Sequence, residues 1–111
     1  YRAARRLLER GPGLSALFAL GDVIALGAMR ALADQGLSVP GDISVVGYDG
    51  TSSAAYSVPR LTTIRQDTAQ LAERGVQTLL RGIHYAQPPI HEAVPFTLLQ
   101  RESVRVLGPA P

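Results

Sequence analysis

Short apolar runs and longer amphipathic patterns alternate along the chain. Three short runs, two largely apolar and one alternating, are predicted as strands. They cover residues 14–20, 42–49 and 61–65. Three longer patterns repeat apolar positions at helical spacing and are predicted as helices. They cover residues 2–10, 23–35 and 67–83. Strands that alternate with helices are typical of an α/β fold built on a parallel sheet.

The run 42–49 is the centre of this pattern. Its β-branched residues Ile43, Val45 and Val46 predict a buried strand, with Pro40-Gly41 before it and a Gly-Thr-Ser-Ser loop after it at 50–53. In parallel α/β sheets, ligands bind outside the carboxyl ends of the strands. Asp49 is placed at that end, so it is the first residue expected to contact a ligand.

Residues 23–35 form the most apolar helical pattern. Asp22 is well placed to cap the first turn, and Gly36 supplies the left-handed residue that commonly follows a helix end. The first seven residues, 23–29, carry no charge, and a helix that is apolar all round is buried on more than one side. One side can lie on the sheet. A subunit interface is the preferred partner for the other side, with burial inside the chain as the alternative.

The helix at 67–83 is predicted to be amphipathic, with one buried stripe. Asp67 and Gln70 have the spacing of a capping box at its start. The stripe consists of Ala72, Val76, Leu79, Leu80 and Ile83. Residues 50–60, before this helix, are predicted to form a polar loop. Residues 90–100, after it, hold one or two short strands split by Pro95.

Composition narrows the class of protein. The chain has 111 residues, enough for one domain at most, and its hydrophobic share of 46% is ordinary for a folded core. The absence of cysteine excludes a disulfide framework, and no apolar run approaches the roughly 18 residues of a membrane span. Four arginines lie in the first ten residues, where a solvated helix face is favoured over a phosphate contact. Because the chain opens inside a helix, it is expected to be a piece of something longer.

The usual catalytic and cofactor motifs are missing. The sequence has no G-x-S-x-G elbow, P-loop or G-x-G-x-x-G stretch. His84 and His91 have only Glu92 as a close carboxylate, so surface histidines are favoured over a metal site. No histidine is placed to act as a base for the serines of the 50–53 loop. The chain is therefore not expected to be an enzyme or to hold a metal or cofactor.

Three motifs in order carry a family resemblance. They are ALFALGDVIALGAMRAL at 16–32, GLSVPGDISVVGYD at 36–49 and PRLTTIRQ at 59–66. Together they resemble the effector-binding domain of the lactose/galactose-repressor (LacI/GalR) family of bacterial transcription regulators. The closing stretch 98–104 also fits the end of that domain.

The resemblance implies a fold like the type I periplasmic sugar-binding proteins, with a Rossmann-like parallel sheet flanked by helices. Such proteins have two lobes and hold the effector in the cleft between them. This chain then corresponds to the C-terminal part of the domain. Residues 16–60 belong to the second lobe, the strand and helix at 61–84 cross towards the first lobe, and strands within 90–104 return.

Three positions match effector contacts of the family. Asp49 matches a carboxylate that accepts hydrogen bonds from effector hydroxyls, with an Asx-type turn as the alternative. Gln66 matches a crossover residue that faces the cleft in some members. Asp22 matches the second residue of a frequent Asn-Asp pair, although capping the helix is its stronger reading. The chain departs from the family at Gly21, where Asn is frequent, and at Gly50, where many members carry a second acid.

The function implied is that of an effector-sensing and dimerisation domain in a cytoplasmic transcription regulator. Its effector would be a small molecule, a sugar or a related metabolite, and operator DNA would be bound only by an N-terminal helix-turn-helix outside this chain. The expected homodimer interface consists of Val23, Leu26, Met29 and Arg30. No membrane contact is expected. A periplasmic sugar-binding protein of an ABC transporter, with the same fold, is the alternative.

Overall fold

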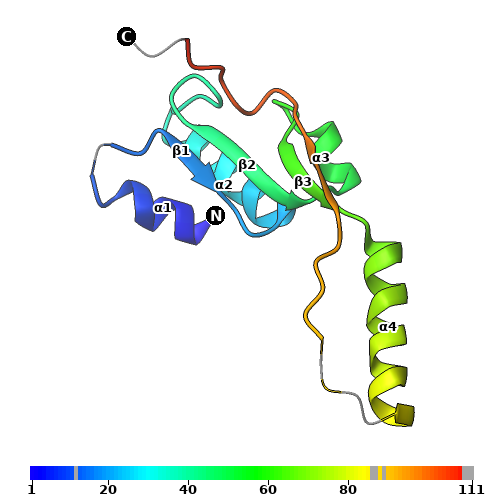
Figure 1. Ribbon diagram of the computed structural model, residues 1–111. Helices are drawn as coiled ribbons and strands as arrows, with labels where there is room; N and C mark the ends of the chain where they lie inside the picture. The colour runs from blue at the N-terminus through cyan, green and yellow to red at the C-terminus, as the bar shows by residue number, and fades with distance from the viewer. Residues whose placement is uncertain (12, 86–87, 89, 109–111) are drawn as a thin grey trace. The chain divides into compact units, whose positions relative to one another are not determined.

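The structure is a computed structural model that describes residues 1–11, 13–85, 88 and 90–108. Its helices are α1 (Arg2–Leu8), α2 (Asp22–Asp34), α3 (Ser52–Tyr56) and α4 (Thr68–Tyr85). Its strands are β1 (Ala16–Phe18), β2 (Ser44–Asp49), β3 (Thr62–Gln66) and β4 (Phe96–Leu99) (Figure 1). The chain divides into two compact units, Gln66–Thr97 and the remainder, which are described separately below.

The strands form one sheet in the order β1-β2-β3-β4. β1 and β2 run parallel with Ala16 opposite Ser44, and β2 and β3 run parallel with Val46 opposite Thr62. Parallel pairing requires a crossover between strands, and α2 supplies it between β1 and β2. The α/β fold with a parallel sheet is therefore confirmed.

The helix α2 covers β2 and carries much of the core. Leu32 on α2, Val45 on β2 and Leu61 before β3 are fully buried in one cluster. The helix ends as expected. Gly36 has a φ of +71°, its amide donates to the carbonyl of Ala33, and the amide of Leu37 donates to the carbonyl of Leu32. These two bonds form a Schellman motif, which satisfies carbonyls at the helix end.

Two predicted elements in the first unit need correction. β1 has three residues rather than seven and is not buried, since Phe18 is 54% exposed. Among the strands of the described residues it pairs with β2 alone, which places it at the edge of the sheet. The predicted loop 50–60 contains the short helix α3, which is anchored by the fully buried Ala54. The carbonyl of Ala54 accepts the amide of Leu61 and draws α3 against the start of β3.

The second unit consists mainly of α4. The carboxylate of Asp67 accepts the backbone amide of Gln70 at 3.0 Å, which confirms one bond of the predicted capping box. The predicted buried stripe is wrong within this structure, because α4 has no buried residue and Ile83 is 67% exposed. An amphipathic pattern shows that a helix needs an apolar partner, but it does not say whether the same stretch of chain supplies one. Only one strand, β4, forms within the predicted 90–100 segment, and it begins after Pro95.

Candidate functional site

The carboxyl end of β2 turns sharply at Asp49. This residue has a φ of +110°, and Gly50 after it has a φ of +72°. Positive φ is uncommon for residues other than glycine, and such strained conformations cluster at binding and catalytic sites. The predicted place of Asp49 at the strand end is therefore confirmed, together with an unusual backbone that the sequence did not reveal.

The carboxylate of Asp49 lies in an open position. Asp49 is exposed, and no residue in the described part of the chain donates a hydrogen bond to its oxygens. Its Oδ2 would lie 3.4 Å from a Cβ added to Gly21, so the two residues are close neighbours. An ionised carboxylate only accepts hydrogen bonds, and a free one suits a ligand that offers several hydroxyl donors.

Gly50 fits tightly against β3. A Cβ at this position would lie 2.5 Å from the Cβ of Arg65 and 2.9 Å from its Cα. The positive φ of Gly50 disfavours a side chain independently of this crowding. The glycine that replaces the family's frequent second acid is thus required by this form of the turn.

Asp22 is buried beneath the same turn. It is 0% exposed, and three hydrogen bonds occupy its carboxylate. Its Oδ2 accepts the backbone amide of Thr51 at 2.6 Å and the Thr51 hydroxyl at 2.9 Å, and its Oδ1 accepts the Thr63 hydroxyl at 2.5 Å. Gly47 makes room for this carboxylate, since a Cβ there would collide with Oδ1. Asp22 thereby ties together α2, the turn after β2, and β3.

The expected capping role of Asp22 is wrong. The N-cap of α2 is Gly21, which has no side chain to offer, and Asp22 is the first residue of the helix. A buried carboxylate needs several donors, and Thr51 and Thr63 supply them from elements distant in sequence. Its predicted contact with an effector stays a prediction.

The other predicted positions lie in varied surroundings. Gln66 is the last residue of β3, is half-buried, and begins the second compact unit. On α2, Val23 is 76% exposed, Leu26 is half-buried and packs against the core, and Met29 is 8% exposed within the core. Arg30 is exposed and pairs with Asp34 at 2.7 Å. The contact of Gln66 with an effector and the interface role of these α2 residues stay predictions.

The opposite, amino end of β2 and β3 is held by the segment after β4. Ser103 is fully buried between the strands, where its hydroxyl donates to the carbonyl of Val45 at 2.6 Å and accepts the amide of Thr62 at 2.8 Å. The amide of Val45 donates in turn to the carbonyl of Ser103 at 2.8 Å. Sequence patterns did not single out Ser103, because a lone serine gives no periodic signal.

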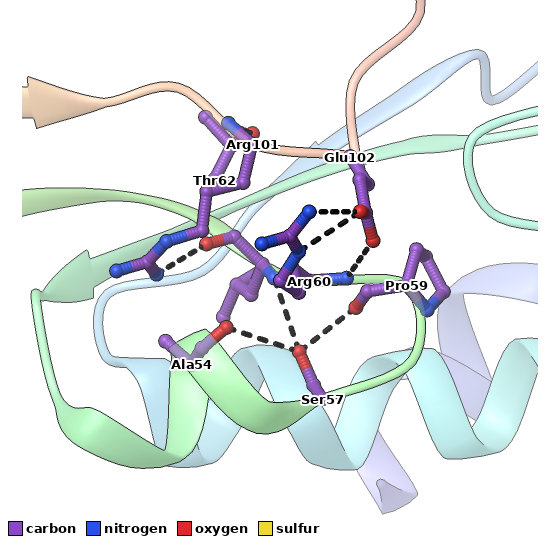
Figure 2. Close-up of polar contacts among 8 residues, drawn as sticks. Ala54, Ser57, Pro59, Arg60, Thr62, Arg101 and Glu102 are labelled. Carbon is purple, nitrogen blue, oxygen red and sulfur yellow. Dashed lines mark hydrogen bonds and ion pairs between the residues drawn. The ribbon is translucent and has the colours of Figure 1, made fainter.

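Charged groups reinforce this amino end (Figure 2). The carboxylate of Glu102 pairs with the guanidinium of Arg60 at 2.7 Å and accepts the Arg60 amide at 2.9 Å. These bonds hold the pKa of the Glu102 carboxyl below its usual range. The Arg101 guanidinium donates to the carbonyl of Leu61, and the Ser57 hydroxyl donates to the carbonyl of Pro59. These bonds tie the segment after β4 to the amino ends of β2 and β3.

Within residues 1–11, 13–85, 88 and 90–108, no group of three or more His, Cys, Asp or Glu residues is placed to hold a metal ion. Helices in that part of the chain also lack the length and apolarity needed to cross a membrane.

One family model and several curated proteins match this chain in sequence. Residues 1–104 match the model of the periplasmic binding protein-like domain family. The HTH-type transcriptional regulator MalR of Clostridium butyricum is 38% identical over 103 residues, and the HTH-type transcriptional repressor PurR of Escherichia fergusonii is 40% identical over 105 residues. The alignments cover 93% and 94% of this chain. The chain spans 31% of the length of each relative.

Solved structures agree with these relatives. The Lac repressor dimer bound to operator and the anti-inducer ONPF superposes with a TM-score of 0.83 at 35% identity, covering 96% of this chain and 37% of that one. The transcriptional regulator CelR in complex with cellobiose superposes with a TM-score of 0.82 at 34% identity. That superposition covers 92% of this chain and 32% of the CelR chain.

Proposed function

The chain belongs to the periplasmic-binding-protein-like domain family in the form found in LacI-type regulators, and we propose that it is the C-terminal part of a regulator's effector-binding domain. In this proposal a small molecule binds at the carboxyl end of β2 and shifts the populations of two states of the regulator. DNA is bound by a helix-turn-helix outside these 111 residues. The main support for an effector site at this position is the exposed carboxylate of Asp49, which lies on a turn with a strained backbone.

A sugar or a related metabolite is the proposed effector. The CelR structure contains cellobiose, and the free acceptor oxygens of Asp49 suit paired hydroxyl donors. Gln66 is included as a second candidate contact, because an amide at the end of β3 can both donate and accept.

The periplasmic sugar-binding protein of an ABC transporter is the second candidate function. The shared fold permits it, but the relatives reported above are named as transcriptional regulators and none as transport proteins. The regulator is therefore favoured, and with it a cytoplasmic location and a role without catalysis.

The domain arrangement is proposed from the same relatives. Residues 16–60 are assigned to the second lobe, residues 61–84 to the crossover towards the first lobe, and 90–104 to the return. The division of the chain between Arg65 and Gln66, and again between Thr97 and Leu98, supports this assignment. The exposed apolar residues of α4 also support it, because they require an apolar partner.

A homodimer through α2 is proposed as well. The Lac repressor structure is a dimer, and Val23 and Arg30 on α2 are exposed, with Leu26 half-buried beside them. Met29 is expected to support this surface from the core rather than to contact the partner subunit directly. A full-length regulator that sediments as a monomer at micromolar concentration would contradict this proposal.

Substitution of Asp49 tests the effector site in the full-length regulator. We expect Asp49→Ala to weaken sugar binding by about 1–3 kcal/mol, because a ligand hydroxyl loses its charged acceptor. Binding is measured by calorimetry with D-glucose, D-galactose, maltose and cellobiose. In the variant Asp49→Asn, the asparagine can adopt the positive φ of this position. The variant therefore removes the charge without disturbing the turn. Glu9→Ala, an exposed acid elsewhere, is the matched control. Wild-type affinity in both Asp49 variants would remove Asp49 from the site.

A further inference from the structure

We propose that Asp22 is a positioning residue that holds the Asp49 turn in its binding conformation and does not itself contact the effector. This inference rests on the proposed function, because it assumes that the effector meets Asp49. It departs from the family expectation that places Asp22 among the contacts. The residues involved all lie in the first compact unit.

The acceptor capacity of Asp22 is already used inside the protein. Its side chain has no exposed surface, and its two oxygens accept three hydrogen bonds at 2.5–2.9 Å. All three come from neutral donors, the Thr51 amide and the hydroxyls of Thr51 and Thr63. A carboxylate suits this place because its two oxygens can accept all three hydrogen bonds. Because no atom of Asp22 is exposed, an effector that binds at the protein surface cannot contact this residue.

The same hydrogen bonds fix the two residues that follow Asp49. Asp22 holds the amide of Thr51 directly. It also holds the Thr63 hydroxyl, whose oxygen accepts the amide of Gly50 at 3.3 Å. The turn after β2 is therefore anchored at two consecutive amides, one directly and one through Thr63.

This anchoring explains how Asp49 keeps an unfavourable backbone. Strained residues persist only where their surroundings leave no alternative. The strand β2 fixes the chain before Asp49, and the Asp22 network fixes it immediately after, so a φ of +110° is imposed from both sides. The exposed Asp49 carboxylate is thereby presented beside Gly21 without any hydrogen bond to its own oxygens from the described residues.

Hydrogen–deuterium exchange with mass spectrometry on the full-length regulator tests this role. In Asp22→Ala, we expect exchange at residues 49–51 to be on the order of tenfold faster, because hydrogen bonds to a charged acceptor are lost. Thr63→Val keeps the shape of the side chain and should release Gly50 while Thr51 stays protected. Asp22→Asn keeps a carbonyl oxygen for Thr51 and should leave Thr51 at the wild-type rate. Peptides covering 101–105, at the other end of the strands, serve as the internal control.

Sugar binding in the same variants completes the test. With the four sugars named above, Asp22→Ala should both lower the affinity and raise the exchange rate at residues 49–51. In Asp22→Asn, the affinity and the exchange rate should both stay close to the wild-type values. Weaker binding in Asp22→Asn with unchanged exchange would make Asp22 a contact residue and overturn the proposal. Equal acceleration in all peptides of both Asp22→Ala and Thr63→Val would overturn it as well. If the wild type binds none of the sugars, the proposed sugar effector fails, but the exchange result still decides the role of Asp22.

Discussion

The two ends of β2 and β3 are built in opposite ways. At the amino end, Ser103 bonds to the backbone of both strands, and Arg60 pairs with Glu102 beside it. At the carboxyl end, the buried network of Asp22 supports an acid, Asp49, whose oxygens are free of hydrogen bonds from described residues. One end therefore links the strands through bonded polar groups, while the other has a buried hydrogen-bond network beneath an exposed carboxylate.

Removal of the Ser103 hydroxyl should have the largest effect on stability. Ser103→Ala leaves the carbonyl of Val45 and the amide of Thr62 without their buried partner, and each unsatisfied group costs about 1–3 kcal/mol. We expect a loss of about 2–4 kcal/mol in the free energy of unfolding, measured by urea denaturation. Ser53→Ala, at an exposed serine of α3, should change little. Weaker sugar binding without a loss of stability would contradict the division between the two ends.

A side chain at Gly50 should disturb the turn at the carboxyl end of β2. The expected loss of stability is smaller than that of Ser103→Ala. Gly50→Ala places a methyl group against Arg65 at a positive φ, which is expected to cost about 1–3 kcal/mol. Gly82→Ala is the matched control, because a Cβ there meets nothing within 4 Å and alanine favours a helix. We expect Gly50→Ala to lose sugar affinity as well, whereas Ser103→Ala should keep it. Equal sugar affinity in Gly50→Ala and wild type would show that the turn is not needed for binding.

The pH dependence of the Arg60–Glu102 pair should be the smallest effect. Hydrogen bonds from Arg60 lower the pKa of Glu102 in the folded chain, so the pair stabilises the fold above the usual carboxyl pKa of about 4.3. That contribution is lost as the pH falls through the lowered pKa, because the carboxyl then binds a proton. The stability difference between wild type and Glu102→Gln, from urea midpoints, should therefore be larger at pH 7 than at pH 3. Both side chains are substantially exposed, so high salt should reduce the difference. A difference that does not change with pH would exclude the ion pair as a contributor.

Local features of the chain were predictable from the sequence. Gly36 ends α2 in the left-handed conformation, and the β-branched run before Asp49 forms β2. The cap depends on contacts within a few residues, and the composition of a buried strand is visible in the sequence even though its pairing partners are distant. The family motifs likewise led to the α/β fold and to regulators of the LacI type.

Long-range polar contacts were not predictable. Asp22 lies 29 residues from Thr51 and 41 from Thr63, and Ser103 lies 58 residues from Val45. No periodic pattern connects such positions, so Asp22 was assigned to a local cap. Residues 50–60 were likewise predicted as a loop because most of them are polar. The segment contains α3, whose one buried residue is Ala54.

The sequence by itself determined the order of the strands and of the helices other than α3, the place of Asp49 at the end of β2, and the membership of the family. Those properties arise from hydrophobic periodicity, turn residues and short motifs, all of which are local. Only the tertiary structure decided that Asp49 has a strained backbone and an open carboxylate, and that Asp22 is buried beneath it. These properties depend on which distant donors reach a carboxylate, and that is settled only when the elements pack together.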